Sequence, residues 1–490
     1  MKDFEKAKID CKIIPVPKEV TCFGGTVRVA PAITTQEADW KPLLEVFGKA
    51  ADKIFHTQVT NQPGAIALVR DDSLSGDRYV IEIDEQVTVF ASGYEGAGYG
   101  IASVLQLAAF ENGEFTFERQ RISDWPDKDY RCFMVDIARQ WHPFEELFSY
   151  VDLCFFFKTR YLHIHFMDAE GYALPSKVFP KLSLNGNTYT FAQMKELCQY
   201  AKDRGILLIP EVEMPGHVTV LNKVYPEVFS DKIDGEVDTM TIDTGADLNA
   251  EWVLCAGSKS AFEGITKLID EVVEIFGDIP YIHLGGDEVN SAVWEQCSVC
   301  RAYMREHGLQ NGEELYAEFL GRVTDYALSK GLRPVIWEGF AKEYAHHISR
   351  DVLVIAWETK YQTPQELLES GFRIVNGSWK PLYIVSQFSV PRKEGEWGIR
   401  EILNWNLYEW QNWWEEAESG LNPIHIQPTD ALLGGQVSSW GQTYEEEITF
   451  VVRFLASAME RIWSVRRYRN YETFTKHYKI QSRKAFRLII

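Results

Sequence analysis

Eight short apolar runs, rich in β-branched and aromatic residues, recur through the larger part of the chain. They cover residues 131–137, 160–166, 206–212, 280–285, 333–337, 352–357, 372–376 and 431–436. Longer amphipathic stretches separate them, including residues 144–158, 191–204, 260–276 and 312–330. Strands that are buried on both faces form such continuous runs when helices connect them in a parallel sheet. Eight strand–helix units predict a (β/α)8 barrel, with the long segments 214–258 and 377–430 as loops at the carboxyl ends of strands.

A smaller domain is expected ahead of the barrel. Residues 79–83 and 87–90 alternate between apolar and polar side chains, as half-buried strands do, and a glycine-rich turn with an apolar helix near residues 98–110 follows. The polar, proline-containing segment 123–129 is typical of a domain boundary. We therefore predict an N-terminal α+β domain at residues 1–125 and a barrel domain with C-terminal helices at residues 126–490.

The charge of the chain limits its partners. Fifty basic and 71 acidic residues among 490 give a net charge of -21, which argues against nucleic acid or an anionic membrane surface as a partner. The first residues, MKDFEKAKID, lack the apolar core of a signal peptide, and no run of about 18 uncharged apolar residues occurs. We expect a neutral small-molecule partner and a cytoplasmic location without a signal peptide.

The cysteines and two histidines give weak signals for a metal. The eight scattered cysteines are typical of a reducing compartment rather than of a disulfide framework. Cys297 and Cys300 form one CxxC motif with no second pair, which favours incidental helix cysteines over a zinc or redox site. His163 and His165 alternate on a strand without an accompanying carboxylate triad, so we interpret them as structural. No metal and no cofactor is expected.

Polar or tryptophan side chains follow nearly every predicted barrel strand. In chain order they are Asp136, Arg139, Asp168, Glu211, Glu213, His217, Asp287, Glu288, Trp337, Glu338, Trp357, Glu358, Asn376, Tyr383 and Trp440. The carboxyl ends of barrel strands meet at one face, where the active sites of such barrels form. The sequence therefore predicts a single site built from these side chains.

The adjacent carboxylates Asp287 and Glu288 follow two glycines, Gly285 and Gly286. Neighbouring strand residues point in opposite directions, so both can reach one pocket only where the backbone turns, which glycine permits. Each carboxylate raises the pKa of the other, and the pair then shares one proton. An N-cap aspartate with a glutamate in the first helical turn is the alternative for an isolated pair. The other strand ends favour an acid pair.

Two neighbours on one strand end cannot flank a sugar as the carboxylates of most retaining glycosidases do, about 5 Å apart on opposite sides of the anomeric carbon. Such a pair needs a nucleophile from elsewhere, and a substrate 2-acetamido group can supply it by forming an oxazolinium ion. Asp287 would then hold the amide N–H. Glu288 would act as general acid and afterwards as general base.

From about Tyr130 to Trp440 the chain resembles glycoside hydrolase family 20, the β-N-acetylhexosaminidases. The motifs that carry the resemblance are HLGGDEV, the PGH that ends at His217 and the later tryptophans, while DIARQWHP, LPSKVFPKLS and WNLYEWQNWW resemble the intracellular-type bacterial members. The N-terminal part looks like the α+β domain that often precedes this barrel. The resemblance implies an exo-acting enzyme that removes terminal β-GlcNAc, β-GalNAc or both with retention.

The resemblance also implies roles for the polar residues. Asp287 and Glu288 match the acetamido-orienting aspartate and the acid/base. Arg139 matches the arginine that binds the O3 and O4 hydroxyls, although a strand-end arginine can also form a salt bridge to Asp136. Asp168 and His217 resemble the pair that relays toward the general acid, and structural hydrogen bonds are the alternative for both.

The aromatic residues of the site follow by the same resemblance. Trp337, Trp357 and Trp440 correspond to the walls of the acetamido pocket, and Tyr383 to the tyrosine that hydrogen-bonds the acetamido carbonyl. Core packing is the alternative for each tryptophan. Trp405, in the loop before the eighth strand, is a candidate for contacts with the O4 and O6 side of the sugar or with the leaving group.

Departures from the family pattern leave the sugar specificity open. Many members have Asp-Asp-Gln where this chain has residues 168–170, an acidic or amide residue where it has Val385, and a glutamate where it has Gln442. Positions 385 and 442 usually contact the O4 and O6 side, so both epimers are possible substrates. A disaccharide-releasing relative of the lacto-N-biosidase type and a non-catalytic carbohydrate-binding protein are the alternatives; the presence of Glu288 disfavours the second.

Overall fold

The computed structural model describes residues 5–6, 10–230, 240–241, 247–277, 279–385 and 398–490. Its larger part is a closed barrel of eight parallel strands, in which β17 pairs with β21 and β21 with β9. The strands are β9 (Tyr130–Asp136), β10 (Tyr161–His165), β11 (Leu207–Glu211), β14 (Tyr281–His283), β15 (Arg333–Trp337), β16 (Leu353–Ala356), β17 (Arg373–Asn376) and β21 (Leu432–Trp440). Each coincides with a predicted apolar run, so the predicted (β/α)8 barrel is confirmed.

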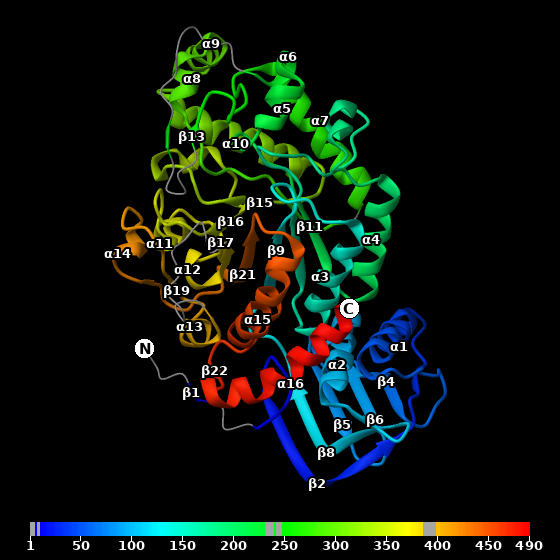
Figure 1. Cartoon of the computed structure of the whole chain (residues 1–490). Helices are drawn as coiled ribbons and strands as arrows, with labels where there is room; N and C mark the ends of the chain where they lie inside the picture. The colour runs from blue at the N-terminus through cyan, green and yellow to red at the C-terminus, as the bar shows by residue number, and fades with distance from the viewer. Residues whose placement is uncertain (1–4, 7–9, 231–239, 242–246, 278, 386–397) are drawn as a thin grey trace.

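Helices surround the barrel (Figure 1). They include α3 (Phe144–Phe156), α4 (Phe191–Asp203), α7 (Lys259–Phe276), α10 (Gly312–Ser329), α11 (Pro364–Glu369) and α15 (Tyr444–Trp463). Side-chain caps fix several of their first turns: Thr190 forms a capping box with Gln193, and Asn311 accepts the backbone N–H of Glu314 at 2.9 Å. The first four of these helices match the predicted amphipathic stretches.

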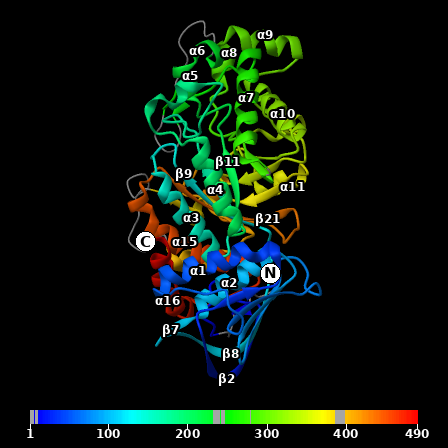
Figure 2. The same cartoon turned by 90° about the vertical axis from the view of Figure 1, so that its right-hand side faces the viewer.

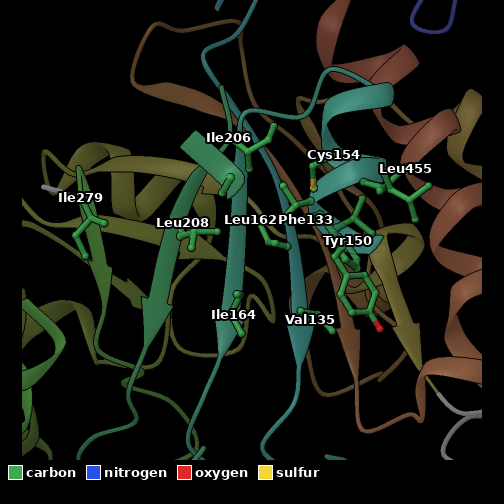
Figure 3. Close-up of a cluster of buried hydrophobic side chains, with 14 of the residues drawn as sticks. Phe133, Val135, Tyr150, Cys154, Leu162, Ile164, Ile206, Leu208, Ile279 and Leu455 are labelled. Carbon is green, nitrogen blue, oxygen red and sulfur yellow. The ribbon is translucent and has the colours of Figure 1, made fainter. Parts of the chain in front are cut away.

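The barrel strands are buried on both faces, which explains why they are continuous apolar runs. Phe133 and Val135 of β9 point outward to the helices, where Tyr150 and Cys154 of α3 lie (Figure 3). The alternate residues of the barrel strands point inward. That inner cluster includes Cys132, Met134, Ile209, Val335, Leu353, Ile355 and Val375. The filled interior leaves only the strand ends for a site.

The loops at the carboxyl ends of β11, β14 and β17 carry most of the remaining elements. These are α5 (Thr219–Val224), α6 (Pro226–Phe229), β12 (Met240–Thr241) and β13 (Asp247–Leu248) after β11; α8 (Ala292–Gln296) and α9 (Ser298–His307) after β14; and α12 (Trp379–Leu382), β18 (Tyr383–Val385), α13 (Ile399–Asn404), β19 (Glu409–Trp410), α14 (Glu418–Leu421) and β20 (Ile424–His425) after β17. Strand β18 pairs with the last residues of β21 and extends the barrel wall there.

The N-terminal domain is a mixed sheet with two helices on the face turned to the barrel (Figures 1 and 2). Its strands lie in the order β2 (Glu19–Val29), β8 (Glu114–Asp124), β5 (Tyr79–Ile83), β6 (Val87–Ala91), β4 (Ile66–Arg70) and β3 (Ile33–Thr35), with β7 (Ala109–Glu111) beside β8. The helices are α1 (Lys41–Phe55) and α2 (Tyr94–Leu107). The predicted small α+β domain is confirmed in its architecture.

Helix α2 differs from the prediction, which placed a glycine-rich turn before a helix near residues 98–110. The helix begins at Tyr94 and contains the glycines, and it ends at Leu107. A Cβ on Gly96 would lie 2.9 Å from the carbonyl oxygen of Arg78, and one on Gly100 would collide with Val89. These glycines therefore allow the helix to pack closely on the sheet rather than ending it.

The two ends of the chain connect the two parts of the molecule. Helix α16 (Tyr471–Ile489) packs on α1, α3 and α15. The buried Arg469 pairs with Glu460 at 2.7 Å and donates to the carbonyl oxygens of Cys11 and Ile13 at 2.8 and 2.9 Å. The division at residues 125 and 126 stays a prediction, since both ends contact both parts. No helix in the described ranges has both the length and the apolar composition of a membrane span.

Candidate active site

The acid pair lies in a tight turn directly after β14. Gly285 and Gly286 have φ angles of 67° and 103°, and Glu288 has a φ of 52°. A Cβ on Gly285 would collide with the carboxylate of Glu213 from the neighbouring strand end. Glycine is therefore required on steric grounds as well as for its φ angle. The turn brings Asp287 and Glu288 to the same side of the backbone.

Both carboxylates face one imidazole. The Nε2 atom of His217 lies 3.6 Å from Oδ1 of Asp287 and 3.4 Å from Oε2 of Glu288. The side chain of Asp287 is 11% exposed and that of Glu288 is 17% exposed. The two carboxylates therefore lie close together at one strand end, beside His217.

Asp287 is prepared to accept a hydrogen bond. Burial, together with the nearby charge of Glu288, raises the pKa of Asp287 to about 7, although His217 opposes the shift. Among the described residues, Oδ1 of Asp287 has no hydrogen-bond partner. A buried acceptor that receives no hydrogen bond lowers the stability of the folded protein. Atoms that bind a ligand often have this property, because the ligand supplies the missing donor.

A chain of charged groups connects the acid pair to the barrel. Nδ1 of His217 lies 3.1 Å from Oδ1 of Asp168, and the other oxygen of Asp168 lies 2.7 Å from the Arg139 guanidinium, which also donates to Asp136 at 2.9 Å. Burial alone would lower the pKa of His217, but Asp168 and Asp287 raise it well above its usual value. These carboxylates therefore favour the protonated form of His217, which lies beside both acids.

Arg139 keeps part of its guanidinium available despite two carboxylate partners. Its side chain is 27% exposed, and its Cζ atom lies 5.1 Å from the centroid of the Trp440 ring. The salt bridge to Asp136, which was the alternative to a sugar contact, is thus present, and the guanidinium also lies beside Trp440. An arginine fixed in this way can donate to hydroxyl groups without losing its orientation.

Glu211 lies deeper in the barrel and contradicts the view that no carboxylate accompanies the strand histidines. It lies 3.0 Å from Nε2 of His163 and 2.6 Å from Nδ1 of His283, contacts Nδ1 of His165, and accepts from Nε1 of Trp337 at 2.7 Å. Burial raises the pKa of Glu211, but His283 and the other histidines outweigh it and lower the pKa well below its usual value. The sequence could not show this cluster because its members come from four strands.

Two groups of ligand atoms around Glu211 are close enough for a metal ion, and they differ in the protonation of their histidines. His163, Glu211 and His283 have ligand atoms within 4.8 Å of one another, as do His165, Glu211 and Glu213. Burial opposes protonation of His165, yet Glu211 and Asp168 raise its pKa well above the usual value. A protonated imidazole has no lone pair for a metal. This argument applies to the group that contains His165. In the other group burial lowers the pKa of His283 to about 4, so its ring is neutral.

Four aromatic rings form a closed cycle beside the acid pair. Ring centroids lie 6.2 Å apart for Trp337 and Trp357, 6.2 Å for Trp357 and Tyr383, 6.0 Å for Tyr383 and Trp440, and 5.8 Å for Trp440 and Trp337. Burial and the charge of Asp287 raise the pKa of Tyr383 well above its usual value, so its hydroxyl remains a donor. All four predicted aromatic residues are thus brought together.

Two predicted residues are not directed toward this cycle. Trp405 is 1% exposed, packs in the main hydrophobic core and donates its Nε1 to the carbonyl oxygen of Glu409 at 2.8 Å. Gln442 is buried and donates to the carbonyl oxygen of Ile384 at 3.3 Å. Trp405 is thus a core residue, and its backbone carbonyl oxygen accepts a hydrogen bond from Arg461 of α15 at 2.8 Å.

Three tryptophans that the sequence did not single out lie at the site. Trp379 and Trp414 extend the aromatic cycle, with ring centroids 5.2 Å apart for Trp379 and Tyr383 and 4.8 Å for Trp379 and Trp414. Trp252 donates to the carbonyl oxygen of Glu288 at 2.9 Å, and its ring centroid lies 4.4 Å from that of His217. The tryptophan-rich run near residues 405–414 was a usable signal for Trp414, whereas Trp252 had none.

Comparison with known proteins gives two matches to family models and several relatives. Residues 129–466 match the catalytic domain of glycosyl hydrolase family 20, and residues 10–125 match domain 2 of that family. The chain is 29% identical over 346 residues to a β-hexosaminidase of Akkermansia muciniphila, a match that covers 66% of this chain and 68% of that protein. It is 28% identical over 362 residues to a β-hexosaminidase of Porphyromonas gingivalis, covering 66% of this chain and 45% of that protein.

The chain thus spans less than half the length of the Porphyromonas relative. A solved structure of an exo-β-N-acetylglucosaminidase from Vibrio harveyi, in complex with N-acetylglucosamine, has the same fold, with a TM-score of 0.83 at 20% identity over 97% of this chain and 77% of that chain. The catalytic-domain match covers well over half of the sequence and includes the whole barrel. The protein therefore belongs to glycosyl hydrolase family 20.

Proposed function

We propose that the protein is an exo-acting β-N-acetylhexosaminidase that removes terminal non-reducing β-GlcNAc, β-GalNAc or both with retention. The observation that carries this proposal is the position of His217, which faces Asp287 and Glu288 together. Two acids on one side cannot flank the anomeric carbon as a nucleophile and an acid do in a two-carboxylate retaining enzyme. The nucleophile is then the acetamido oxygen of the substrate itself, and an oxazolinium ion is the intermediate.

The aromatic cycle is the proposed pocket for the acetamido group. Its methyl group would lie among Trp337, Trp357 and Trp440, which exclude water from the intermediate. The hydroxyl of Tyr383 would donate to the acetamido oxygen and hold it below the anomeric carbon, C1. The unpartnered Oδ1 of Asp287 would accept the amide N–H. This arrangement orients the oxygen for attack and offsets the positive charge that develops on the ring.

The proposed reaction has two steps. The acetamido oxygen forms a bond to C1 while the bond to the leaving oxygen breaks, and Glu288 transfers its proton to that oxygen. The resulting Glu288 carboxylate then takes a proton from water, whose oxygen bonds to C1 as the oxazolinium ring opens. Both steps invert C1, so the product keeps the β configuration.

Substrate binding would move the shared proton to the residue that needs it. In the unliganded site burial raises the pKa of Asp287 to about 7, so the proton resides partly there. A hydrogen bond from the substrate amide favours the ionised form of Asp287. Glu288 then holds the proton at the start of the first step, and the imidazolium of His217 stabilises its carboxylate afterwards.

Arg139 and the far side of the pocket would set the sugar specificity. The guanidinium of Arg139, fixed by Asp136 and Asp168, would donate to the O3 and O4 hydroxyls of the terminal sugar. The side chain of Val385 cannot make a hydrogen bond, and Gln442 already donates to Ile384. No carboxylate at these two positions distinguishes an axial from an equatorial O4, which supports acceptance of both epimers.

We also propose that the protein acts in the cytoplasm. The eight cysteines form no disulfide in the described part of the chain. Sulfur atoms as close as the 3.6 Å between Cys255 and Cys300 would be prone to oxidation in a compartment that favours disulfides. Fractionation of the native cell with periplasmic and cytoplasmic markers tests this location.

Turnover of a β-GlcNAc disaccharide and of an aryl β-GlcNAc by two variants tests the assigned roles. Glu288→Gln should lower kcat on the disaccharide by about 10²–10⁴-fold and retain much more activity on the aryl glycoside, which needs little protonation. Asp287→Asn should lower kcat on both by about 10³-fold, because orientation and charge stabilisation serve every substrate. Equal, mild losses in both variants would contradict the roles.

Two further outcomes would reject the proposed activity. Release of a disaccharide with no release of a single sugar would identify a lacto-N-biosidase-type enzyme, and sugar binding without any turnover would identify a binding protein. A thiazoline analogue of the cyclised intermediate should inhibit the wild type competitively. Trapping of a covalent ester between the enzyme and the sugar would rule out the substrate-assisted path.

A further inference from the structure

Three cysteines from two separate loops meet beside the active site. Cys255 precedes α7 in the loop after β11, while Cys297 and Cys300 lie at the beginning of α9 in the loop after β14. All three are buried. Sγ of Cys255 lies 3.7 Å from Sγ of Cys297 and 3.6 Å from Sγ of Cys300, and all three sulfurs lie within 4.8 Å of one another. The CxxC motif thus has a third cysteine that the sequence did not assign to it.

These distances match a metal site better than a disulfide. A disulfide bond is about 2.05 Å long, far shorter than either separation. Thiolates that lie about 2.3 Å from a tetrahedral zinc ion are roughly 3.8 Å apart. Two cysteines separated by two residues, combined with further ligands from elsewhere in the chain, are also a usual pattern of structural zinc sites.

The surroundings favour the thiolate form that a metal requires. The backbone N–H of Gly257 lies 3.4 Å from Sγ of Cys300 and donates to it. Cys297 is the N-cap residue of α9 and Cys300 is in its first turn, where the positive end of the helix dipole stabilises negative charge. A Cβ on Gly257 would lie 2.8 Å from Cα of Cys300, so only glycine lets the two loops approach this closely.

We propose that Cys255, Cys297 and Cys300 supply three of the four ligands of a zinc ion that joins the two loops. On binding, each thiol releases its proton to solvent and the sulfur lone pair forms the bond to the metal. Zinc keeps its charge, so the step needs no oxidant or reductant. The site is structural, because all three sulfurs are buried and none of the residues assigned to the sugar pocket is among the three ligands.

The joined loops hold the general acid. Trp252, three residues before Cys255, donates to the carbonyl oxygen of Glu288 at 2.9 Å and contacts the ring of His217. Trp294, three residues before Cys297, donates to the carbonyl oxygen of Leu254 at 2.9 Å. The metal would therefore fix the segment that positions Glu288. This consequence rests on the proposed function, whereas the metal site itself does not.

Metal analysis of the full chain tests the site directly. Protein purified without chelator, from medium that contains zinc, should hold about one zinc ion per chain by elemental mass spectrometry. Cys300→Ala should lose it. Cys154→Ala, at a cysteine that is also fully buried but lies in α3, is the matched control and should retain it. Cobalt(II) exchanged into the wild type should show the thiolate-to-cobalt charge-transfer band of a sulfur-rich tetrahedral site.

A zinc-free wild-type protein that also gives no such cobalt band would overturn the proposal. So would an intact wild-type mass that is two hydrogens below that of the reduced chain, if the disulfide lies among these cysteines. If Cys300→Ala does not fold, the wild-type zinc content and cobalt spectrum still decide. The loop-fixing role has its own readout: removal of zinc should lower kcat on a disaccharide about tenfold and kcat on an activated aryl glycoside less. Equal losses on both would leave the metal site standing and overturn its link to Glu288.

Discussion

Glu211 and Asp287 are both buried carboxylates at the ends of adjacent barrel strands, yet they have opposite properties. Glu211 has three histidines and the Trp337 indole around it, and the histidines hold its pKa well below the usual value despite its burial. Asp287 has one of its oxygens without a described partner, and burial raises its pKa to about 7. The two residues are thus similar in type and in burial. Their pKa values differ because the hydrogen-bond donors and charges around each carboxylate differ.

The comparison teaches how one strand edge can hold both a structural anion and a reactive one. A carboxylate whose lone pairs are all used stabilises the fold as a charge. A carboxylate with an unused lone pair costs stability until a ligand supplies the donor. The two lie within one connected group, because His165 contacts both Glu211 and Asp168, and Asp168 contacts His217.

The largest expected effect comes from neutralising the structural anion. Glu211→Gln should lower the free energy of unfolding by about 3–5 kcal/mol at pH 7, because it leaves the protonated His165 without its deepest counter-ion. The lowered pKa of Glu211 means that this stabilisation is present at neutral pH and is lost as the pH falls through that pKa. Chemical denaturation at pH 7 measures it.

The matched variant Asp287→Asn should be at least as stable as the wild type at pH 7, although it is nearly inactive. It replaces a carboxyl group whose ionised form is disfavoured by burial, as its pKa of about 7 shows, and whose Oδ1 accepts no hydrogen bond from the described residues although His217 lies 3.6 Å away. If both variants lost the same stability, the distinction between a structural and a reactive carboxylate would be broken.

The pH dependence sharpens the comparison further. Because folding raises the pKa of Asp287 from its ordinary value of 3.8 to about 7, the wild type should lose stability relative to Asp287→Asn as the pH rises through this range, by up to about 4 kcal/mol. Over the same range kcat/KM on an activated aryl glycoside should rise with pH, since catalysis uses the Asp287 carboxylate and this leaving group needs little protonation. On a disaccharide kcat/KM should fall at the high end of the range, because the proton lost is the one that Glu288 transfers. Denaturation and rate measurements between about pH 4 and about pH 9 give both curves.

A stability difference between the wild type and Asp287→Asn that stays constant across this range would contradict the raised pKa. The Glu288→Gln variant is the control, because its Asp287 has lost a neighbouring negative charge. Its rate profile on an aryl glycoside should therefore move to lower pH.

The smallest effect is expected at Glu213, a third carboxylate at these strand ends. Burial and the charge of Glu211 raise its pKa well above the usual value, which favours its protonated form. A protonated carboxyl and an amide have nearly the same shape, and Glu213→Gln should change the free energy of unfolding by less than about 1 kcal/mol at pH 7. A loss as large as that of Glu211→Gln in the same denaturation assay would show that Glu213 is ionised.

Much of the fold was predictable because its signals are local. Each barrel strand is an apolar run whose neighbours are amphipathic, and the two glycines before Asp287 mark the turn that the acid pair needs. The helix at Tyr94 was misplaced because glycine inside a helix resembles a turn when the sheet that requires it is unknown. Trp405 was a candidate for sugar contacts for a similar reason: an indole in a polar loop gives no sign that the folded chain buries it.

The sequence by itself determined the barrel, the order of its strands and the presence of an acid pair at the fourth strand end, since period and turn chemistry depend on residues that are neighbours in the chain. Only the tertiary structure decided what surrounds each of these side chains. His217 contacts Asp168, and Glu211 contacts histidines from two other strands. Cys255 lies beside Cys297 and Cys300. Burial and charge set the pKa of a group, and both come from segments that are distant in sequence and adjacent only once the chain is folded.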